Sequence, residues 1–307
     1  MALPARFHGV VPPVVTPLTT DYRVDYGSFT AVIEHLLAGG VHGLFILGST
    51  SEVVFHDEAT RRAILEHAVK VVNGRAPILA GTIDPTTDRV IGHARAAKAI
   101  GVDAMVVTAP FYTRTSQPEV VDHFRYVREA VDAPIIAYDI PVCVHTKLER
   151  ATIVTLAREG AIAGVKDSSG DEGGFRYLLS DLADRPEVFL MTGAELTVDG
   201  ILLAGAHGVV PGLGNVDPHA YVRLYAAARR GDWAQARKEQ DRLSRLFEIV
   251  RVSLPRTSAG SAGVGGFKTA MRRLGIIQTN IMARPQRSLN DEESARVEAI
   301  LRDVGLV

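Results

Sequence analysis

The chain has 307 residues, with 34 Lys and Arg against 35 Asp and Glu and a hydrophobic fraction of 47%. This length is normal for an α/β barrel of about 250 residues with extensions, and the composition excludes a disordered chain. A net charge of −1 gives no long-range attraction to nucleic acid or to an anionic membrane.

The cysteine content and the N-terminal sequence indicate a compartment. Cys143 is the single cysteine, so an intrachain disulfide is excluded. The first 15 residues lack a continuous apolar segment and contain Pro12 and Pro13, so no signal peptide is expected. Because no run of about 18 apolar residues occurs, we also expect no membrane span. These features predict a protein of the reducing cytoplasm.

Short apolar runs rich in Val and Ile recur along the chain, bounded by Gly or Pro. Runs of this length are typical of buried parallel strands. Eight are expected to be strands: Gly9–Val15, His42–Leu47, Pro77–Gly81, Ala104–Thr108, Pro134–Tyr138, Ala161–Lys166, Val188–Met191 and Gly208–Pro211.

The segments between these runs have helical spacing. Asp25–Gly39 places its apolar residues on one face, and Asp57–Val72 begins at an acidic N-cap. Asp84–Ile100 and Gln117–Val131 follow the same pattern. Eight strands alternating with helices predict a closed (β/α)8 TIM barrel with right-handed crossovers. A doubly wound open sheet is the alternative, although it usually has fewer strands and a glycine-rich first turn, which is absent here.

After Val216 the pattern changes to helices with no strand between them. We therefore expect a barrel domain over residues 1–216 and a helical extension over residues 217–307 that packs on the barrel. The expected helices of the extension are Pro218–Arg230, Trp233–Val252, Gly266–Leu274 and Asn290–Val304.

The carboxyl ends of the strands are where a barrel of this kind carries its functional groups. Lys166 ends the sixth apolar run, and burial there would disfavour its charged ammonium form. A neutral amine can attack a ketone carbonyl and form an imine. The alternative is a structural lysine paired with Asp167.

Hydroxyl groups end three other strands. Tyr138 follows the neighbouring run, and a phenol held by other hydroxyls can relay the protons that imine chemistry requires. Thr50 and Tyr112 can supply those hydroxyls, whereas a tyrosine at the edge of the core is the alternative for Tyr138 alone. Gly48 and Ser49 begin a turn whose N–H groups and hydroxyls suit a substrate carboxylate.

Four motifs, in this order and spacing, resemble the dihydrodipicolinate synthase and N-acetylneuraminate lyase family of class I, pyruvate-dependent aldolases. By this resemblance, which covers about residues 7–220, Lys166 is the Schiff-base lysine and Tyr138 the catalytic acid/base. Ser49 and Thr50 would bind the carboxylate of the 2-oxo acid, with Thr50 also touching Tyr138. The motifs are Gly48-Ser49-Thr50-Ser51-Glu52, Thr108-Ala109-Pro110-Phe111-Tyr112, Tyr138-Asp139-Ile140-Pro141 and Gly164-Val165-Lys166-Asp167.

The resemblance also implies an assembly and a cofactor requirement. Tyr112 would complete the hydroxyl relay, and in the family this tyrosine often comes from the partner subunit. The family is typically a homotetramer built as a dimer of dimers, and it needs no metal or organic cofactor.

Some positions depart from the family pattern. Dihydrodipicolinate synthases carry a carboxylate-binding arginine at the position of Cys143, which cannot form a bidentate ion pair. Asp139 replaces the usual Asn, and Ser51 replaces the usual Gly. Ser168 and Glu195 lie near positions that contact substrate hydroxyls in sugar-acid lyases, with a rim salt bridge as the alternative for Glu195. The expected substrate-binding residues are Gly48, Ser49, Thr50, Cys143, Ser168, Gly193, Glu195 and Val210.

Two other signals fail. The glycine-rich segment before Lys268 resembles a phosphate-binding loop, but Gly266 stands where a lysine is required and no strand precedes it. We expect its glycines to allow close helix packing. The ten histidines have no metal-binding spacing, and Cys143 is expected to line the substrate pocket.

The leading hypothesis is a lyase or aldolase that acts on pyruvate, an aldehyde and a 2-keto-3-deoxy sugar acid. Three alternatives remain: dehydration of a keto-deoxy sugar acid through the same enamine, 4-hydroxy-tetrahydrodipicolinate synthesis despite Cys143, and a non-catalytic sugar-acid sensor.

Overall fold

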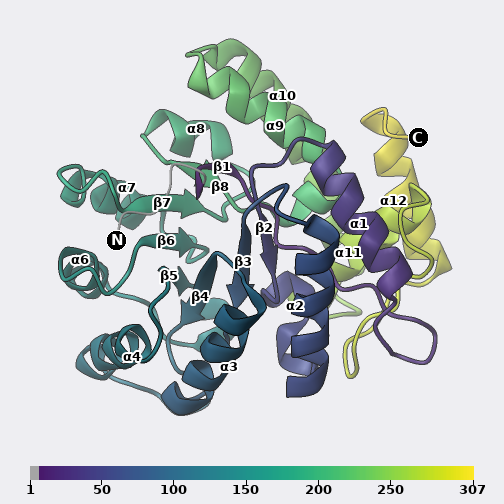
Figure 1. Cartoon of the computed structure of the whole chain (residues 1–307). Helices are drawn as coiled ribbons and strands as arrows, with labels where there is room; N and C mark the ends of the chain where they lie inside the picture. The colour runs from purple at the N-terminus through teal and green to yellow at the C-terminus, as the bar shows by residue number, and fades with distance from the viewer. Residues whose placement is uncertain (1–6) are drawn as a thin grey trace.

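A computed structural model describes residues 7–307. In that part of the chain, eight parallel strands form one sheet in the order β1-β8-β7-β6-β5-β4-β3-β2, surrounded by helices (Figure 1). The strands are β1 (Gly9–Val10), β2 (Leu44–Ile46), β3 (Ile78–Gly81), β4 (Ala104–Thr108), β5 (Ile135–Asp139), β6 (Gly164–Asp167), β7 (Phe189–Thr192) and β8 (Gly208–Val209).

The segment after β1 pairs with β2, so the first and last strands in this order are also neighbours. Pro13 and Phe45 form a parallel bridge, and Val14 N donates to Phe45 O at 2.8 Å. β1 is shorter than the expected Gly9–Val15 because Pro12 and Pro13 have no N–H to donate. With β1 also beside β8, each strand neighbours the next along the chain, so the open-sheet alternative is wrong.

Helices follow the strands and are capped as their sequences predict. Asp25 and Asp57 accept the N–H of Ser28 and Thr60 at the starts of α1 and α2. α3 begins three residues later than expected because the Asp84 carboxylate instead bonds Arg89 and His93. The helices are α1 (Tyr26–Ala38), α2 (Glu58–Val72), α3 (Thr87–Ile100), α4 (Gln117–Ala130), α5 (Pro141–Val144), α6 (Arg150–Arg158), α7 (Glu172–Asp181) and α8 (Val198–Leu203).

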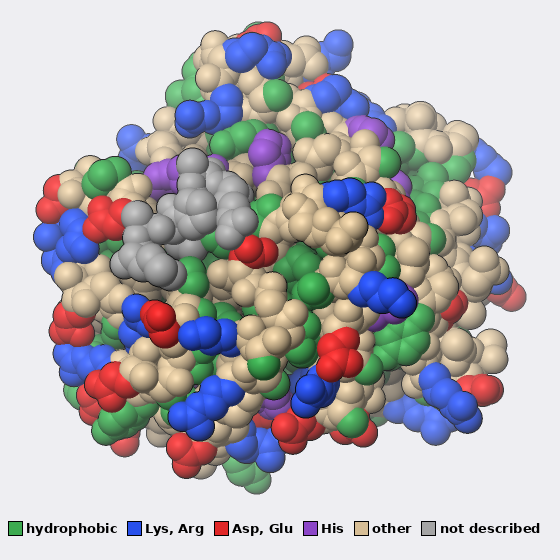
Figure 2. All heavy atoms as spheres, in the orientation of Figure 1, with side chains coloured by type: hydrophobic (Ala, Val, Ile, Leu, Met, Phe, Trp, Pro, Cys, Tyr) green, Lys and Arg blue, Asp and Glu red, His purple; other side chains and the backbone are tan. Residues whose placement is uncertain are grey.

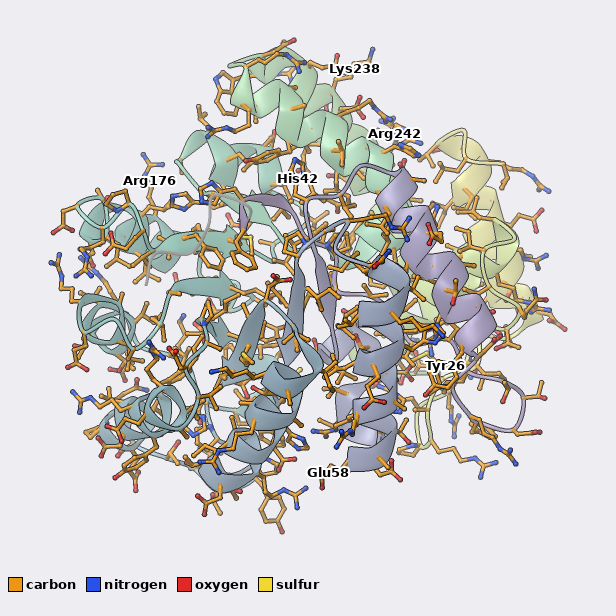
Figure 3. All side chains as sticks on the ribbon, in the orientation of Figure 1. Tyr26, His42, Glu58, Arg176, Lys238 and Arg242 are labelled. Carbon is orange, nitrogen blue, oxygen red and sulfur yellow. The ribbon has the colours of Figure 1, made fainter. Side chains whose placement is uncertain are left out.

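Four helices follow β8. Arg242, labelled in Figure 3, joins three segments, because it pairs with Asp217 at 2.5 Å and donates to Val304 O at 3.1 Å. A Cβ at Gly266 would lie 2.6 Å from Ile249 O, so this glycine allows the close packing that we expected. The helices are α9 (Pro218–Arg229), α10 (Trp233–Leu246), α11 (Ala259–Arg273) and α12 (Asp291–Asp303).

Two boundaries of these helices differ from expectation. The expected helix Trp233–Val252 ends at Leu246 and continues as a 3-10 helix over Phe247–Arg251. α11 begins seven residues before Gly266, because Ser258 caps it by accepting from Ser261 N.

The surface carries mixed charges. Figure 2 shows basic and acidic side chains interspersed over the visible face. Within residues 7–307, none of the helices combines the length and apolar character that a bilayer span requires.

Candidate active site

Lys166 and Tyr138 are neighbours at the carboxyl ends of adjacent strands. In the parallel register Tyr138 of β5 pairs with Lys166 of β6, with Thr108 and Met191 as the next partners on either side. Side chains that share a register position on neighbouring strands point to the same face of the sheet. The strand ends therefore place the phenol and the amine side by side, as predicted.

The Lys166 amine is buried without a counter-ion. The side chain is 4% exposed, and Nζ lies 3.6 Å from the centre of the Tyr138 ring and 5.9 Å from that of Phe45. Its hydrogen bond goes to Ser168 Oγ at 2.9 Å, and among the described residues it belongs to no ion pair. The alternative pairing with Asp167 is therefore wrong.

Asp167 faces away because it is the next residue along the strand. Its carboxylate accepts from Ser169 N at 2.9 Å and from Ser169 Oγ at 3.0 Å. Burial raises the pKa of Asp167, and these hydrogen bonds oppose the rise.

Gly193 makes room for the hydroxyl that holds Lys166. A Cβ at this position would clash with Ser168 Oγ and approach Asp167 O to 3.1 Å. Only glycine therefore lets the end of β7 pass so close to Ser168. The predicted substrate-binding residues Gly193 and Ser168 thus act on the position of the Lys166 amine.

The Tyr138 hydroxyl contacts a different partner from the one expected. It lies 3.2 Å from Ser49 Oγ, while its ring meets Phe45 edge to face at 6.1 Å. The expected contact was with Thr50, which lies one residue further along the same turn. The turn is a short 3-10 helix, η2 (Ser49–Ser51), and successive residues on it point in different directions, so Ser49 rather than Thr50 meets the Tyr138 hydroxyl.

Ser51 explains one departure from the family pattern. Its buried hydroxyl donates to Val14 O at 2.5 Å and accepts from Gly48 N at 3.2 Å. Its carbonyl accepts from Thr16 Oγ1 at 3.0 Å. The serine therefore fixes the turn to the segment that follows β1.

Tyr112 does not join this group within one chain. Its side chain is 96% exposed, and its φ of 74° is left-handed. The loop after β4 therefore turns outward, and the expected hydroxyl relay through Tyr112 is not formed inside the single chain.

Glu195 lies beneath the turn after β8 rather than in a rim salt bridge. Its Oε1 accepts from Leu213 N at 2.7 Å and from the Tyr221 hydroxyl at 2.9 Å. Burial raises the pKa of Glu195 to about 7, and the hydrogen bonds from Leu213 N and the Tyr221 hydroxyl oppose the rise. A carboxyl with this pKa exchanges protons near neutral pH.

The last two predicted substrate-binding residues are Cys143 and Val210. Cys143 is exposed on α5, where desolvation raises the pKa of its thiol and the Lys166 charge opposes that rise. Val210 is buried directly after β8, and its N–H donates to Thr192 O at 2.8 Å.

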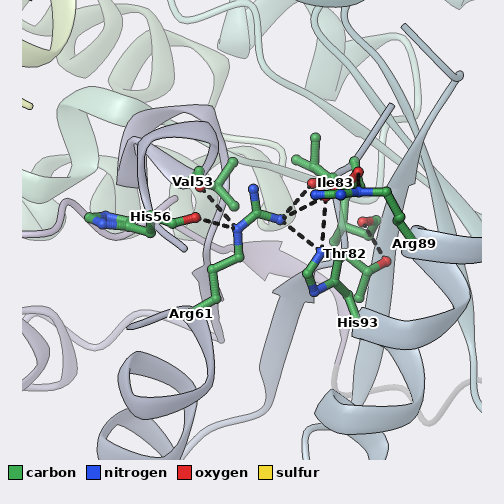
Figure 4. Close-up of polar contacts among 9 residues, drawn as sticks. Val53, His56, Arg61, Thr82, Ile83, Arg89 and His93 are labelled. Carbon is green, nitrogen blue, oxygen red and sulfur yellow. Dashed lines mark hydrogen bonds and ion pairs between the residues drawn. The ribbon is translucent and has the colours of Figure 1, made fainter. Parts of the chain in front are cut away.

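A buried arginine that the sequence analysis missed supports the loops after β2 and β3 (Figure 4). Arg61 Nε donates to Val53 O and His56 O at 3.1 Å each, and Nη1 donates to Ile83 O at 2.9 Å. Asp84 lies 3.6 Å from the same guanidinium. Arg61 lies on α2 beside Arg62, and no local sequence pattern distinguishes this buried arginine from a solvent-exposed helical one.

The arrangement combines a buried amine, a phenol and a turn rich in hydroxyls. Such a set provides a nucleophile, a proton carrier and donors for an anion. Within residues 7–307, no group of three or more His, Cys, Asp or Glu side chains is placed to hold a metal ion.

Known proteins share this chain's sequence and fold. A 4-hydroxy-tetrahydrodipicolinate synthase of Phenylobacterium zucineum is 32% identical over 98% of both chains. A probable 2-dehydro-3-deoxy-D-pentonate aldolase, YjhH of Escherichia coli K12, is 28% identical over 98% of this chain and 99% of its own. The structure of YagE, a prophage protein of E. coli K12 in complex with pyruvate, has a TM-score of 0.92 at 28% identity and covers 98% of this chain and 99% of its own.

The model of the dihydrodipicolinate synthetase family matches residues 6–304, which is nearly the whole chain. Relatives of this family are named as synthases and aldolases. The chain therefore belongs to the dihydrodipicolinate synthetase family and is a class I lyase or aldolase.

Proposed function

We propose that Lys166 forms a Schiff base with a 2-oxo acid such as pyruvate. The enzyme would use it to cleave or form a carbon–carbon bond of a hydroxylated 2-oxo acid of the 2-keto-3-deoxy sugar acid type. The observation that supports this most is the buried Lys166 amine, 3.6 Å from the Tyr138 ring centre and without a carboxylate partner among the described residues. A lysine amine is the nucleophile in Schiff-base formation, and a carboxylate partner would favour its charged form, which cannot attack a carbonyl.

In the cleavage direction, the amine attacks the ketone carbon and the carbonyl oxygen leaves as water. The imine then accepts the electron pair of the breaking carbon–carbon bond, which yields an enamine and an aldehyde. The Tyr138 phenol gives its proton to the departing oxygen, and the resulting phenolate takes the proton of the substrate hydroxyl and returns it to the enamine carbon. Water hydrolyses the imine, which frees pyruvate and restores Lys166.

The remaining predicted residues would bind the substrate. The turn of Gly48, Ser49 and Thr50 offers N–H groups and hydroxyls to the carboxylate. The distal hydroxyls would meet the residues around the Lys166 amine. This second group comprises Cys143, Ser168, Gly193, Glu195 and Val210.

Assembly and location are part of the same proposal. The exposed Tyr112 would reach the site of a second copy in a homotetramer built as a dimer of dimers. The single cysteine supports a cytoplasmic location.

The names of relatives favour two substrates. The aldolase name of one relative and the pyruvate bound to YagE support sugar-acid cleavage. The synthase name of the 32% identical relative supports dipicolinate synthesis. Cys143 argues against the latter, because a thiol cannot form the ion pair that a second carboxylate would require.

A substrate panel distinguishes these activities. Pyruvate release from 2-keto-3-deoxy pentonates and hexonates would be measured beside the condensation of pyruvate with aspartate semialdehyde. We expect pyruvate and an aldehyde from at least one sugar acid and at least tenfold slower condensation. Turnover of the semialdehyde alone would favour the synthase, and loss of water without cleavage would favour a dehydratase.

A further inference from the structure

A buried ion pair joins the C-terminal helices to the turn that carries Ser49 and Thr50. Lys268 of α11 is 0% exposed and Glu52, which ends the turn, is 2% exposed. Lys268 Nζ pairs with Glu52 Oε2 and donates to Ile281 O at 2.9 Å.

The other oxygen of Glu52 is also held by the tail. Glu52 Oε1 accepts from Ala283 N at 2.6 Å. Both oxygens of one carboxylate are therefore bound by groups from the C-terminal segment. The sequence separation within the Glu52–Lys268 pair is 216 residues.

The backbone of Glu52 shows why this attachment matters to the turn. Its φ of 58° and ψ of 35° are left-handed, a conformation that a residue other than glycine keeps only where its surroundings fix it. Its N–H donates to Ser49 O at 3.0 Å. Leu47, just before the turn, has a φ of 59° as well. The turn is thus bounded by two strained residues, and the tail holds the second one.

We propose that the Glu52–Lys268 pair is a positioning device that sets the affinity of the site for the carboxylate of a 2-oxo acid. This inference rests on the proposed function. The two residues act through the backbone of Ser49 and Thr50 and do not themselves touch the substrate. Removing one partner leaves the other charge buried and unpaired. The remaining charged side chain would then move toward water, and the turn of Ser49 and Thr50 would lose its fixed conformation.

The test is the pyruvate concentration that gives half-maximal borohydride trapping on Lys166, together with the trapping rate at saturation. For Lys268→Met we expect the half-saturating concentration to rise at least tenfold and the saturated rate to stay within threefold. Glu52→Asp keeps the charge but shortens the side chain by one methylene, and should raise half-saturation about fivefold. The double variant Glu52→Gln/Lys268→Met buries no unpaired charge and should recover most of the lost affinity.

A second tail ion pair provides the matched control. Arg256 pairs with the buried Glu293 at 2.5 Å, and among residues 7–307 neither side chain has a hydrogen bond or ion pair to the turn. Arg256→Met should leave half-saturation within twofold of the wild type, even where it lowers stability.

Three outcomes would overturn the inference. The first is a half-saturating pyruvate concentration equal to that of the wild type in either Lys268→Met or Glu52→Asp. Glu52→Asp can still be measured if Lys268→Met does not fold. The second is an equal rise in Arg256→Met, which would indicate general destabilisation. The third is a wild-type protein with no adduct at any pyruvate concentration, which would overturn the proposed function itself and this inference with it.

Discussion

The carboxyl ends of the barrel strands and the junction with the C-terminal helices each hold a buried lysine and a desolvated glutamate, but the two residues pair only at the junction. Lys268 binds the Glu52 carboxylate directly. At the strand ends, Lys166 donates to the Ser168 hydroxyl, while Glu195 accepts from Leu213 N and the Tyr221 hydroxyl. The same two residue types therefore meet a charged partner at one place and neutral partners at the other.

This difference in partners is accompanied by different influences on the pKa values. At the junction, burial lowers the pKa of Lys268 and the Glu52 charge opposes that change. At the strand ends, burial raises the pKa of Glu195 to about 7. The two lysines are alike in burial and differ in their partners, and this difference is why we propose Lys166 rather than Lys268 as the Schiff-base lysine.

The largest expected effect is the loss of turnover in Lys166→Ala. We expect kcat/KM to fall by about 10⁴-fold or more, because the covalent intermediate cannot form. Since no carboxylate loses a partner, the free energy of unfolding should change by only about 1 kcal/mol. Steady-state kinetics and urea unfolding measure both quantities. Turnover at ordinary rates would refute the assignment of Lys166.

Lys268→Met, unlike Lys166→Ala, should strongly lower the stability of the protein. We expect a loss of about 3–5 kcal/mol in the free energy of unfolding, because Glu52 would be left buried without a counter-charge. Denaturant unfolding measures the loss, and Arg256→Met, at a partly exposed arginine, is the control with an expected loss of about 1 kcal/mol. If Lys268→Met lowers the free energy of unfolding no more than Arg256→Met does, the buried Glu52 does not depend on Lys268 for its counter-charge.

Glu195 should make the stability of the protein depend on pH below neutrality. Its pKa is about 7 in the folded protein against an ordinary value of 4.5, so the folded state binds more protons between these values. Stability should therefore fall as pH rises from about 4.5 to 7, by about 2 kcal/mol from this group.

Glu195→Gln tests that slope, because it removes the titrating group and should flatten the curve. Urea unfolding at several pH values from 5 to 7.5 compares it with the wild type. Tyr221→Phe removes one donor to the carboxylate and should steepen the fall. A parallel pH dependence in wild type and Glu195→Gln would show that this carboxyl is not the source.

The smallest expected effect concerns Gly193→Ala. The new methyl group would displace the Ser168 hydroxyl from Lys166, and we expect trapping with pyruvate to slow about tenfold, or about 1.4 kcal/mol. The double variant with Ser168→Ala removes the clash and should recover part of the rate. Gly200→Ala, where a Cβ meets nothing within 4 Å, is the control and should leave the rate unchanged.

Local sequence patterns were enough for the strands and for the pair at their ends. Apolar runs and helical periods are properties of short segments, so the positions of Tyr138 and Lys166 at neighbouring strand ends followed from them. The contact of Tyr138 with Ser49 rather than Thr50 did not follow. It depends on which way a three-residue turn rotates its hydroxyls, and spacing does not reveal this.

Contacts between residues far apart in the chain could not be predicted from the sequence, for a different reason. Glu52 was noted only as the end of a motif, and Lys268 only as part of a glycine-rich segment. Nothing in either segment indicates a partner 216 residues away. The outward course of Tyr112 was hidden as well, because it depends on a left-handed backbone at a residue that rarely adopts one.

The most direct test of the account is to incubate the protein with pyruvate and borohydride and to map the adduct by peptide mass spectrometry. The account predicts a reduced pyruvyl adduct on Lys166 alone, none on Lys268, and none in Lys166→Arg. The absence of an adduct on Lys166, or its appearance on the paired lysine instead, would contradict it.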